Sequence, residues 1–130
     1  MDNPKIIYAK AFNNHLLEFF DDLILIFPNE KDISIGKKSC QTIINMNITS
    51  ILKIWYRYSY QYHEQIENGD ISFFMEKDYS SDIENAYTKS EAEDVIKRLR
   101  DPIRLLDNAN KEKAMKYIQN LTKISKVFIE

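Results

Sequence analysis

The sequence is poor in glycine, because Gly36 and Gly69 are the only two in 130 residues. Loops that cradle phosphate groups or dinucleotides need several glycines, since only a backbone without side chains can approach such a ligand closely. Two isolated glycines cannot build either kind of loop. The composition therefore excludes these nucleotide-binding sites.

Cysteine and histidine are equally scarce, with Cys40, His15 and His63 as the only examples. One cysteine cannot form an intramolecular disulfide, and we expect an intracellular, reducing location. Cys40 falls on an apolar stripe, where an inert buried thiol is the usual state. His15 shares a helix face with Glu18 and Asp22. No further ligand converges on them in the sequence, so we expect an ordinary helix surface and no metal.

Catalytic signatures are also missing. The segment from His63 to Glu67 begins like the zinc-protease motif His-Glu-x-x-His but ends in glutamate, where the second histidine ligand is required. The aspartates are spread over helix caps and surface positions, with no pair held in opposed environments for acid–base work. We therefore expect no enzyme activity, no cofactor and no metal.

No long hydrophobic run is present, and the longest, Leu23 to Phe27, is far shorter than a membrane span. The net charge of −2 gives no overall attraction to nucleic acid or to an anionic membrane. The last third of the chain is basic and the rest acidic. We interpret this asymmetry as ordinary solvated helix faces and expect no membrane contact.

Helical periodicity, in contrast, runs through almost the whole sequence. With 44% hydrophobic and 29% charged residues, the chain has the composition of a globular protein. No segment shows strand alternation bounded by hairpin turns. The sequence predicts one all-α domain over residues 1–130, a bundle of about six helices with no significant sheet.

The first helix is predicted from Phe12 to Phe27, with Pro28 ending it. A short apolar stretch before it, around Ile6 to Ala9, is either a separate turn or an extension of the helix. Acidic side chains occupy the face opposite the apolar stripe. The predicted stripe consists of Phe12, Leu16, Phe19, Phe20, Leu23, Ile26 and Phe27.

Polar caps predict the next two helices. Asp32 is expected to cap a helix that tolerates Gly36 in its interior, and Asn47 is expected to cap the helix that follows. Asn68 and Gly69 predict a left-handed end of a helix. The core positions of the two helices are Ile33, Cys40, Ile43 and Ile44, and then Ile51, Trp55, Tyr58 and Tyr62.

The following segment is predicted in less regular terms. Asp70 is expected to cap a short helix from Ile71 to about Lys77, and residues 79–87 are expected to form an irregular loop. A capping box then starts another helix, with either Thr88 and Glu91 or Ser90 and Glu93 as its two residues.

The end of the chain predicts two further helices. Asp101 and Pro102 predict an interruption and a new helix, because proline fits the first helical position behind an aspartate cap. The last helix is expected after residues 107–110, with Lys113, Lys116, Lys123 and Lys126 largely on its outer face. Its core positions are Ala114, Ile118, Leu121, Ser125 and Phe128.

The densest aromatic segment runs from Trp55 to Tyr62. A helix turns Trp55 inward and leaves Tyr56 and Tyr60 near the boundary or outside, beside Lys53 and Arg57. Three interpretations stay open: tyrosines that edge the core with wet hydroxyls, a protein interface, and base stacking on nucleic acid.

The lysines of the last helix are a second candidate for contact with a phosphate backbone. The three that we single out are Lys113, Lys116 and Lys123. Glu112 lies among the lysines of this helix, which has no arginine, and both features favour a solvated lysine face.

Three stretches, Phe12–Pro28, Ile66–Tyr79 and Asn110–Lys123, resemble a group of small uncharacterised all-helical proteins of nucleocytoplasmic large DNA viruses (giant viruses). The abundance of isoleucine, asparagine, lysine and tyrosine fits the AT-rich genomes that many organisms and viruses have. The resemblance implies a viral protein of the host cytoplasm, the viral factory or the virion. It carries over no functional residues.

The leading hypothesis from the sequence is a non-enzymatic helical module that binds a viral or host protein or itself. The alternative is a nucleic-acid-associated accessory protein. A third, less favoured hypothesis is a host-directed effector that docks a host helix in a groove of the bundle.

Overall fold

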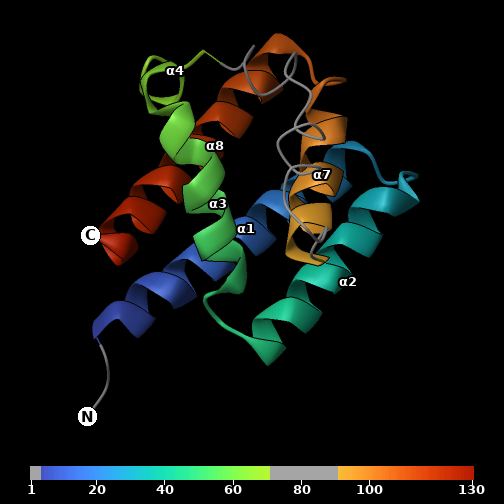
Figure 1. Cartoon of the computed structure of the whole chain (residues 1–130). Coiled ribbons are helices and arrows are strands. Elements are labelled where there is room, and N and C mark those ends of the chain that lie inside the picture. Colours follow the sequence, from blue (N-terminus) through green and yellow to red (C-terminus); the bar gives the residue numbers. More distant parts are fainter. Residues whose placement is uncertain (1–3, 71–90) are drawn as a thin grey trace.

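The computed structural model describes residues 4–70 and 91–130 (Figure 1). Over these residues the chain forms six helices and no strand. One hydrophobic core contains buried side chains from each of these helices. The predicted all-α bundle is confirmed.

The two longest helices, α1 (Pro4–Ile26) and α8 (Asn108–Ile129), lie side by side and antiparallel. Tyr117 near the start of α8 stacks on Phe19 in the second half of α1. At the other end, the ammonium group of Lys5 lies 5.8 Å from the centroid of the Phe128 ring. Figure 1 accordingly shows the start of α1 and the end of α8 on the same side of the molecule.

α1 begins at Pro4, so the apolar stretch around Ile6 is an extension of the helix rather than a separate turn. Proline is tolerated there because the N–H groups in the first turn of a helix have no acceptor within the helix, so the missing N–H of proline costs no hydrogen bond. The predicted stripe is buried from Phe12 to Leu23. Ile26 was predicted wrongly as a core position: it is 38% exposed, because it is the last residue of the helix and borders an open groove.

α2 (Lys31–Met46) packs against both α1 and α7 (Glu91–Ile103). The close approach depends on Gly36, which is buried. A Cβ atom at this position would lie 3.0 Å from Cε1 of Phe20 and 3.1 Å from Cβ of Arg98. Both distances are shorter than ordinary van der Waals contact, so any larger residue at this junction of three helices would require Phe20 or Arg98 to shift.

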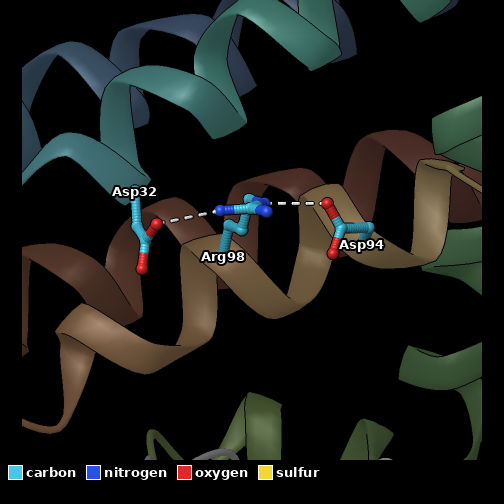
Figure 2. Close-up of polar contacts among 3 residues, drawn as sticks. All are labelled: Asp32, Asp94 and Arg98. Atoms are coloured by element: carbon cyan, nitrogen blue, oxygen red, sulfur yellow. Dashed lines mark hydrogen bonds and ion pairs between the residues drawn. The ribbon is translucent and has the colours of Figure 1, made fainter.

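Arg98 connects α7 to the start of α2 (Figure 2). Its Nε donates a hydrogen bond of 2.8 Å to Asp94, one turn earlier, and its Nη1 donates one of 3.1 Å to Asp32 on α2. The hydrogen bond to Asp94, followed by the charges of both carboxylates, raises the pKa of Arg98. Asp32 was predicted wrongly as the cap of α2: Glu30 takes that position, and Asp32 lies in the first turn, where a negative charge favours the helix dipole.

α3 (Ser50–Gln61) begins after Thr49, so the prediction of Asn47 as its cap was wrong. The Oδ1 atom of Asn47 accepts hydrogen bonds from the backbone N–H and the hydroxyl of Thr49, both 3.1 Å long. Asparagine commonly bonds the backbone two residues ahead of it and so forms a turn rather than a cap. Asn47 therefore lies in the turn before the helix.

α4 (His63–Glu67) ends in the left-handed conformation predicted at Gly69, which has a φ angle of +73°. The N–H of Gly69 donates to the carbonyl of Ile66 at 3.1 Å, and the N–H of Asp70 donates to that of Gln65 at 2.8 Å. This pair of bonds is the Schellman motif. The prediction is confirmed.

No new helix starts at Asp101 and Pro102, so that prediction was wrong. Pro102 lies inside the last turn of α7, which ends one residue later at Ile103. The missing N–H of proline removes a single helical hydrogen bond there, and burial of Pro102 and Ile103 stabilises the turn. The next cap is Asp107, whose side chain accepts a 2.8 Å hydrogen bond from the N–H of Asn110, so α8 starts inside the predicted linker.

Trp55 lies at the centre of the packing between α3 and α8. Its indole N–H donates a 3.1 Å hydrogen bond to the hydroxyl of Thr122, which itself donates to the carbonyl of Ile118 at 2.7 Å. The rings of Trp55 and Phe12 pack edge to face, with centroids 6.1 Å apart and planes inclined by 68°. The whole predicted stripe of α8 is buried: Ala114, Ile118, Leu121, Ser125 and Phe128.

Several predictions lie outside the described residues. They are the short helix from Ile71 to Lys77 behind Asp70, the loop over residues 79–87, and the choice between the two capping boxes ahead of α7, which begins at Glu91.

Candidate interaction surfaces

The first predicted interaction group lies on the outward side of α3. Lys53, Arg57 and Tyr60 are exposed, and Tyr56 is half-buried. The rings of Tyr56 and Tyr60 are neighbours, with centroids 5.8 Å apart and planes tilted by 47°. Tyr60 also lies 6.1 Å from the ring of His63, whose Nδ1 is 3.0 Å from the carbonyl oxygen of Tyr60. The structure therefore brings the four predicted residues together on one accessible face.

The other aromatic residues of this segment point inward, as predicted. Trp55 is 4% exposed and Tyr62 is 8% exposed, while Tyr58 is half-buried. The aromatic segment therefore divides between a core face and an outer face.

The second predicted group, Lys113, Lys116 and Lys123, is exposed along α8. Their spacing of three and seven residues places them in one row on the side of the helix away from the buried stripe. α3 and α8 meet through Trp55 and Thr122 on their inner faces. The lysine row and the α3 group therefore lie on separate helices, each turned away from the contact between them.

A groove between the end of α1 and the start of α8 was missed by sequence reasoning. It encloses about 250 Å³ and also takes in Leu106 of the α7–α8 connection. Leu25 is 79% exposed at its border, the highest value among the large apolar side chains that the structure describes. The residues around the groove are Phe19, Asp22, Leu23, Leu25, Ile26, Leu106, Asn110, Lys113, Ala114 and Tyr117.

Aromatic stacking forms one wall of this groove. The rings of Phe19 and Tyr117 are nearly parallel, with an angle of 3° between their planes and centroids 4.6 Å apart. The ring of His15, also on α1, has its centroid 4.7 Å from that of Tyr117. The hydroxyl of Tyr117 donates a short hydrogen bond to Asp22. Burial, and then this hydrogen bond, raise the pKa of Tyr117. The wall joins the two helices, because Tyr117 of α8 contacts both Phe19 and Asp22 of α1.

The border of the groove carries charges of opposite sign on its two sides. α1 contributes Asp22, with Glu18 and Asp21 exposed on the same stretch of helix, whereas α8 contributes Lys113, with Lys116 exposed one turn further on. Asp21 forms an ion pair with Lys37 of α2.

Leu25 is the residue whose position in the sequence could have indicated this surface. It falls outside the apolar stripe of α1, so a helix places it away from the core.

The chemistry-bearing residues do not assemble into a metal site in the part of the chain that the structure describes. His15 Nδ1 lies 3.7 Å from a carboxylate oxygen of Glu18, while Asp22 is bonded to Tyr117. No group of three or more histidine, cysteine, aspartate or glutamate side chains lies close enough to hold a metal ion among residues 4–70 and 91–130.

Cys40 is fully buried in α2, which confirms the prediction of an inner thiol. Burial raises its pKa to about 12. A thiol with such a pKa is almost entirely protonated at neutral pH, so Cys40 is a poor nucleophile in the folded protein.

None of the helices in the described part of the chain is both long and apolar enough to span a membrane. Comparison with known proteins gives no match to a protein-family model, a curated protein or a solved structure.

Proposed function

We propose that this protein is a non-enzymatic helical module that binds another protein chain through the groove between α1 and α8. The main support for this proposal is an apolar groove that has a strongly exposed leucine, Leu25, at its border. Exposed apolar side chains beside a concave apolar surface are typical of protein interaction sites. The polar residues at the border, Asp22 and Lys113, would orient the partner.

The test is a tagged pull-down from native lysate with a pair of matched variants. Leu25→Asp places a charge at the groove, whereas Met46→Asp places one at the end of α2; the two side chains are 79% and 78% exposed. We expect partners captured by the natural chain to be retained by Met46→Asp and lost from Leu25→Asp. Retention of all of them by Leu25→Asp would contradict the proposal.

The resemblance to proteins of large DNA viruses suggests a setting for this module, as a component of the virion or of the viral factory. Mass spectrometry of purified particles and imaging of a tagged copy in infected cells test it. Absence from both the particle and the factory would remove this part of the proposal.

The α3 face supports a second candidate function, that of a nucleic-acid-associated accessory protein. The specific observation is that Tyr56 and Tyr60 form a ring pair beside the exposed Lys53 and Arg57. Aromatic rings next to basic side chains suit stacking on single-stranded bases. Binding of a labelled oligonucleotide should weaken steeply with salt and should be reduced by Arg57→Ala.

The matched control is Arg104→Ala, because Arg104 is exposed in the connection between α7 and α8. Equal binding by Arg57→Ala and Arg104→Ala would place the contact elsewhere. No binding at low salt would remove this second function.

A further inference from the structure

We infer that the groove between α1 and α8 receives a second copy of this chain, in a two-fold dimer that places α1 of each copy over α8 of the other. This inference rests on the proposed function, since it names the partner of the same groove. Three features support a second copy as the partner: the charges on the two sides of the groove, the exposed leucine and the dimensions of the two helices.

The charge pattern is the first argument. Between residues 11 and 30 the chain has acidic side chains and neither lysine nor arginine, so the second half of α1 is a purely acidic border. The facing part of α8 carries Lys113 and Lys116, both exposed. A surface with an acidic side and a basic side is complementary to itself, because a two-fold rotation exchanges the sides.

The antiparallel arrangement sets the register of such a dimer. Asp22 and Lys113 line the same groove from opposite sides. Asp22 accepts a hydrogen bond from Tyr117, and Lys113 lies one turn before Tyr117 on α8, so Asp22 and Lys113 lie within about one turn of each other along the helix pair. A two-fold axis along the groove therefore brings Asp22 of one copy to Lys113 of the other, and the reverse contact forms at the same time. One turn away, Glu18 and Lys116 come to the same level in the same way.

The apolar contact is the second argument. Leu25 lies three residues after Asp22, one helical turn away, and is 79% exposed. When Asp22 meets the lysine of the other copy, Leu25 is carried toward the groove of that copy, whose buried wall includes Leu23 and Ala114. Each copy thus supplies a Leu25 side chain and a groove that receives the Leu25 of the other copy. Formation of the dimer therefore buries both leucine side chains at once.

The size of the surface is the third argument. α1 has 23 residues and α8 has 22. At 1.5 Å per residue and about 10 Å per helix diameter, the outer face of the pair offers on the order of 600–700 Å². A standard interface buries about 800 Å² per partner, so the face is large enough for a reversible dimer and small for a permanent one.

The test measures mass against concentration by analytical ultracentrifugation, from about 1 μM to about 500 μM, for the natural chain and for charge-reversed variants. We expect a monomer–dimer equilibrium whose dissociation constant rises about tenfold or more in Asp22→Lys and in Lys113→Asp. Leu25→Asp should abolish the dimer, while Met46→Asp should leave it unchanged.

Mixing the two charge variants is the decisive step. In an equimolar mixture, the lysine introduced at position 22 of one variant meets the aspartate introduced at position 113 of the other. The second contact joins the natural Lys113 of the first variant to the natural Asp22 of the second. The mixed dimer should therefore form with close to the natural affinity. The double variant Asp22→Lys/Lys113→Asp should likewise recover the dimer. Circular dichroism of every variant confirms the fold, because Asp22→Lys also removes the hydrogen bond from Tyr117.

A natural chain that remains monomeric over the whole range overturns the second copy as partner. So does a dimer that none of the groove variants weakens, or a mixture that fails to recover the affinity. If the chain is monomeric but Leu25→Asp still loses its captured proteins, the proposed function stands and a different chain occupies the groove. If the chain is monomeric and Leu25→Asp retains all of them, both proposals fail.

Discussion

The contact between α1 and α8 and the contact between α2 and α7 differ in the size of the residues that form them. The α1–α8 contact is spaced by aromatic rings, Phe19 stacked on Tyr117, and it opens into a groove. The α2–α7 contact closes around Gly36 and is fastened at its edge by Arg98. Large rings hold helices apart and leave space at the end of the contact, whereas a glycine lets them approach until little space remains.

Adjacent residues of α1 face these two environments. Phe19 faces Tyr117, and Phe20 lies against Gly36. Both side chains are buried, with exposed fractions of 1% and 0%. They therefore allow the open contact and the closed one to be compared within a single helix turn.

The largest effects are expected from removing these rings one at a time. Phe20→Ala should lower the free energy of unfolding by about 4–5 kcal/mol, because it leaves a closed cavity. Phe19→Ala should cost about 3 kcal/mol, because its space joins the groove and water can fill it. Urea unfolding at neutral pH measures both. Equal losses, or the reverse order, would contradict the distinction between an open and a closed contact.

Gly36→Ala should be the next largest change, with a loss of about 1–2 kcal/mol. Alanine improves helix propensity by about 1 kcal/mol, but the new Cβ presses on the buried ring of Phe20 and on Arg98, and overpacking of this kind costs more than that gain. The control is Ser34→Ala, at an exposed position of α2, which should be neutral or stabilising.

The ring of Phe20 is the source of the expected strain at Gly36. In a Phe20→Leu background, the same Gly36→Ala change should therefore cost less than in the natural chain. An undiminished cost in the double variant would assign the strain to Arg98 instead.

Removal of the Arg98 side chain should cost about 1 kcal/mol. Arg98 bonds Asp94 and Asp32, yet all three side chains are partly exposed and water screens their charges. Thermal unfolding of Arg98→Ala at low and high salt measures this contribution, which should shrink as salt increases. Lys97→Ala, an exposed neighbour on the same helix, serves as the control.

The smallest effect is expected from Tyr117→Phe, and it should appear as a change in pH dependence. The pKa of Tyr117 is raised above its ordinary value near 10, so the unfolded chain loses this proton first as the pH rises. The free energy of unfolding should therefore fall with increasing pH above about 10. Tyr117→Phe should fall less steeply than the natural chain between pH 9 and 11. Identical slopes would show that the hydroxyl of Tyr117 does not contribute.

Periodicity predicted the helices well because the stripes of α3 and α8 repeat every three or four residues over several turns. Gly69 was predictable because a left-handed helix end strongly favours glycine. The caps were harder to predict: Asp32 is equally compatible with a cap and with the first turn, and nothing local indicates that it will bond Arg98 of another helix. Pro102 was misread because its buried neighbours, rather than local preference, determine where α7 ends.

The two predicted interaction groups illustrate the same limit. The periodicity of single helices correctly put Lys53 and Arg57 outside on α3, and Lys113 and Lys116 outside on α8. The groove could not be found in this way, because it depends on which helices become neighbours. Asp22 and Lys113 are separated by most of the chain, and nothing in a single helix indicates that they border the same space.

The rate at which a thiol reagent modifies Cys40 can report how often the fold opens around α2. Cys40 is the only cysteine in the sequence, fully buried, and its pKa is raised to about 12 by burial. A thiol reagent at neutral pH can reach the Cys40 side chain only when α2 separates from its neighbours. The modification rate therefore depends on how frequently α2 opens in this way. Every variant described above can therefore be compared in its opening rate without any added label.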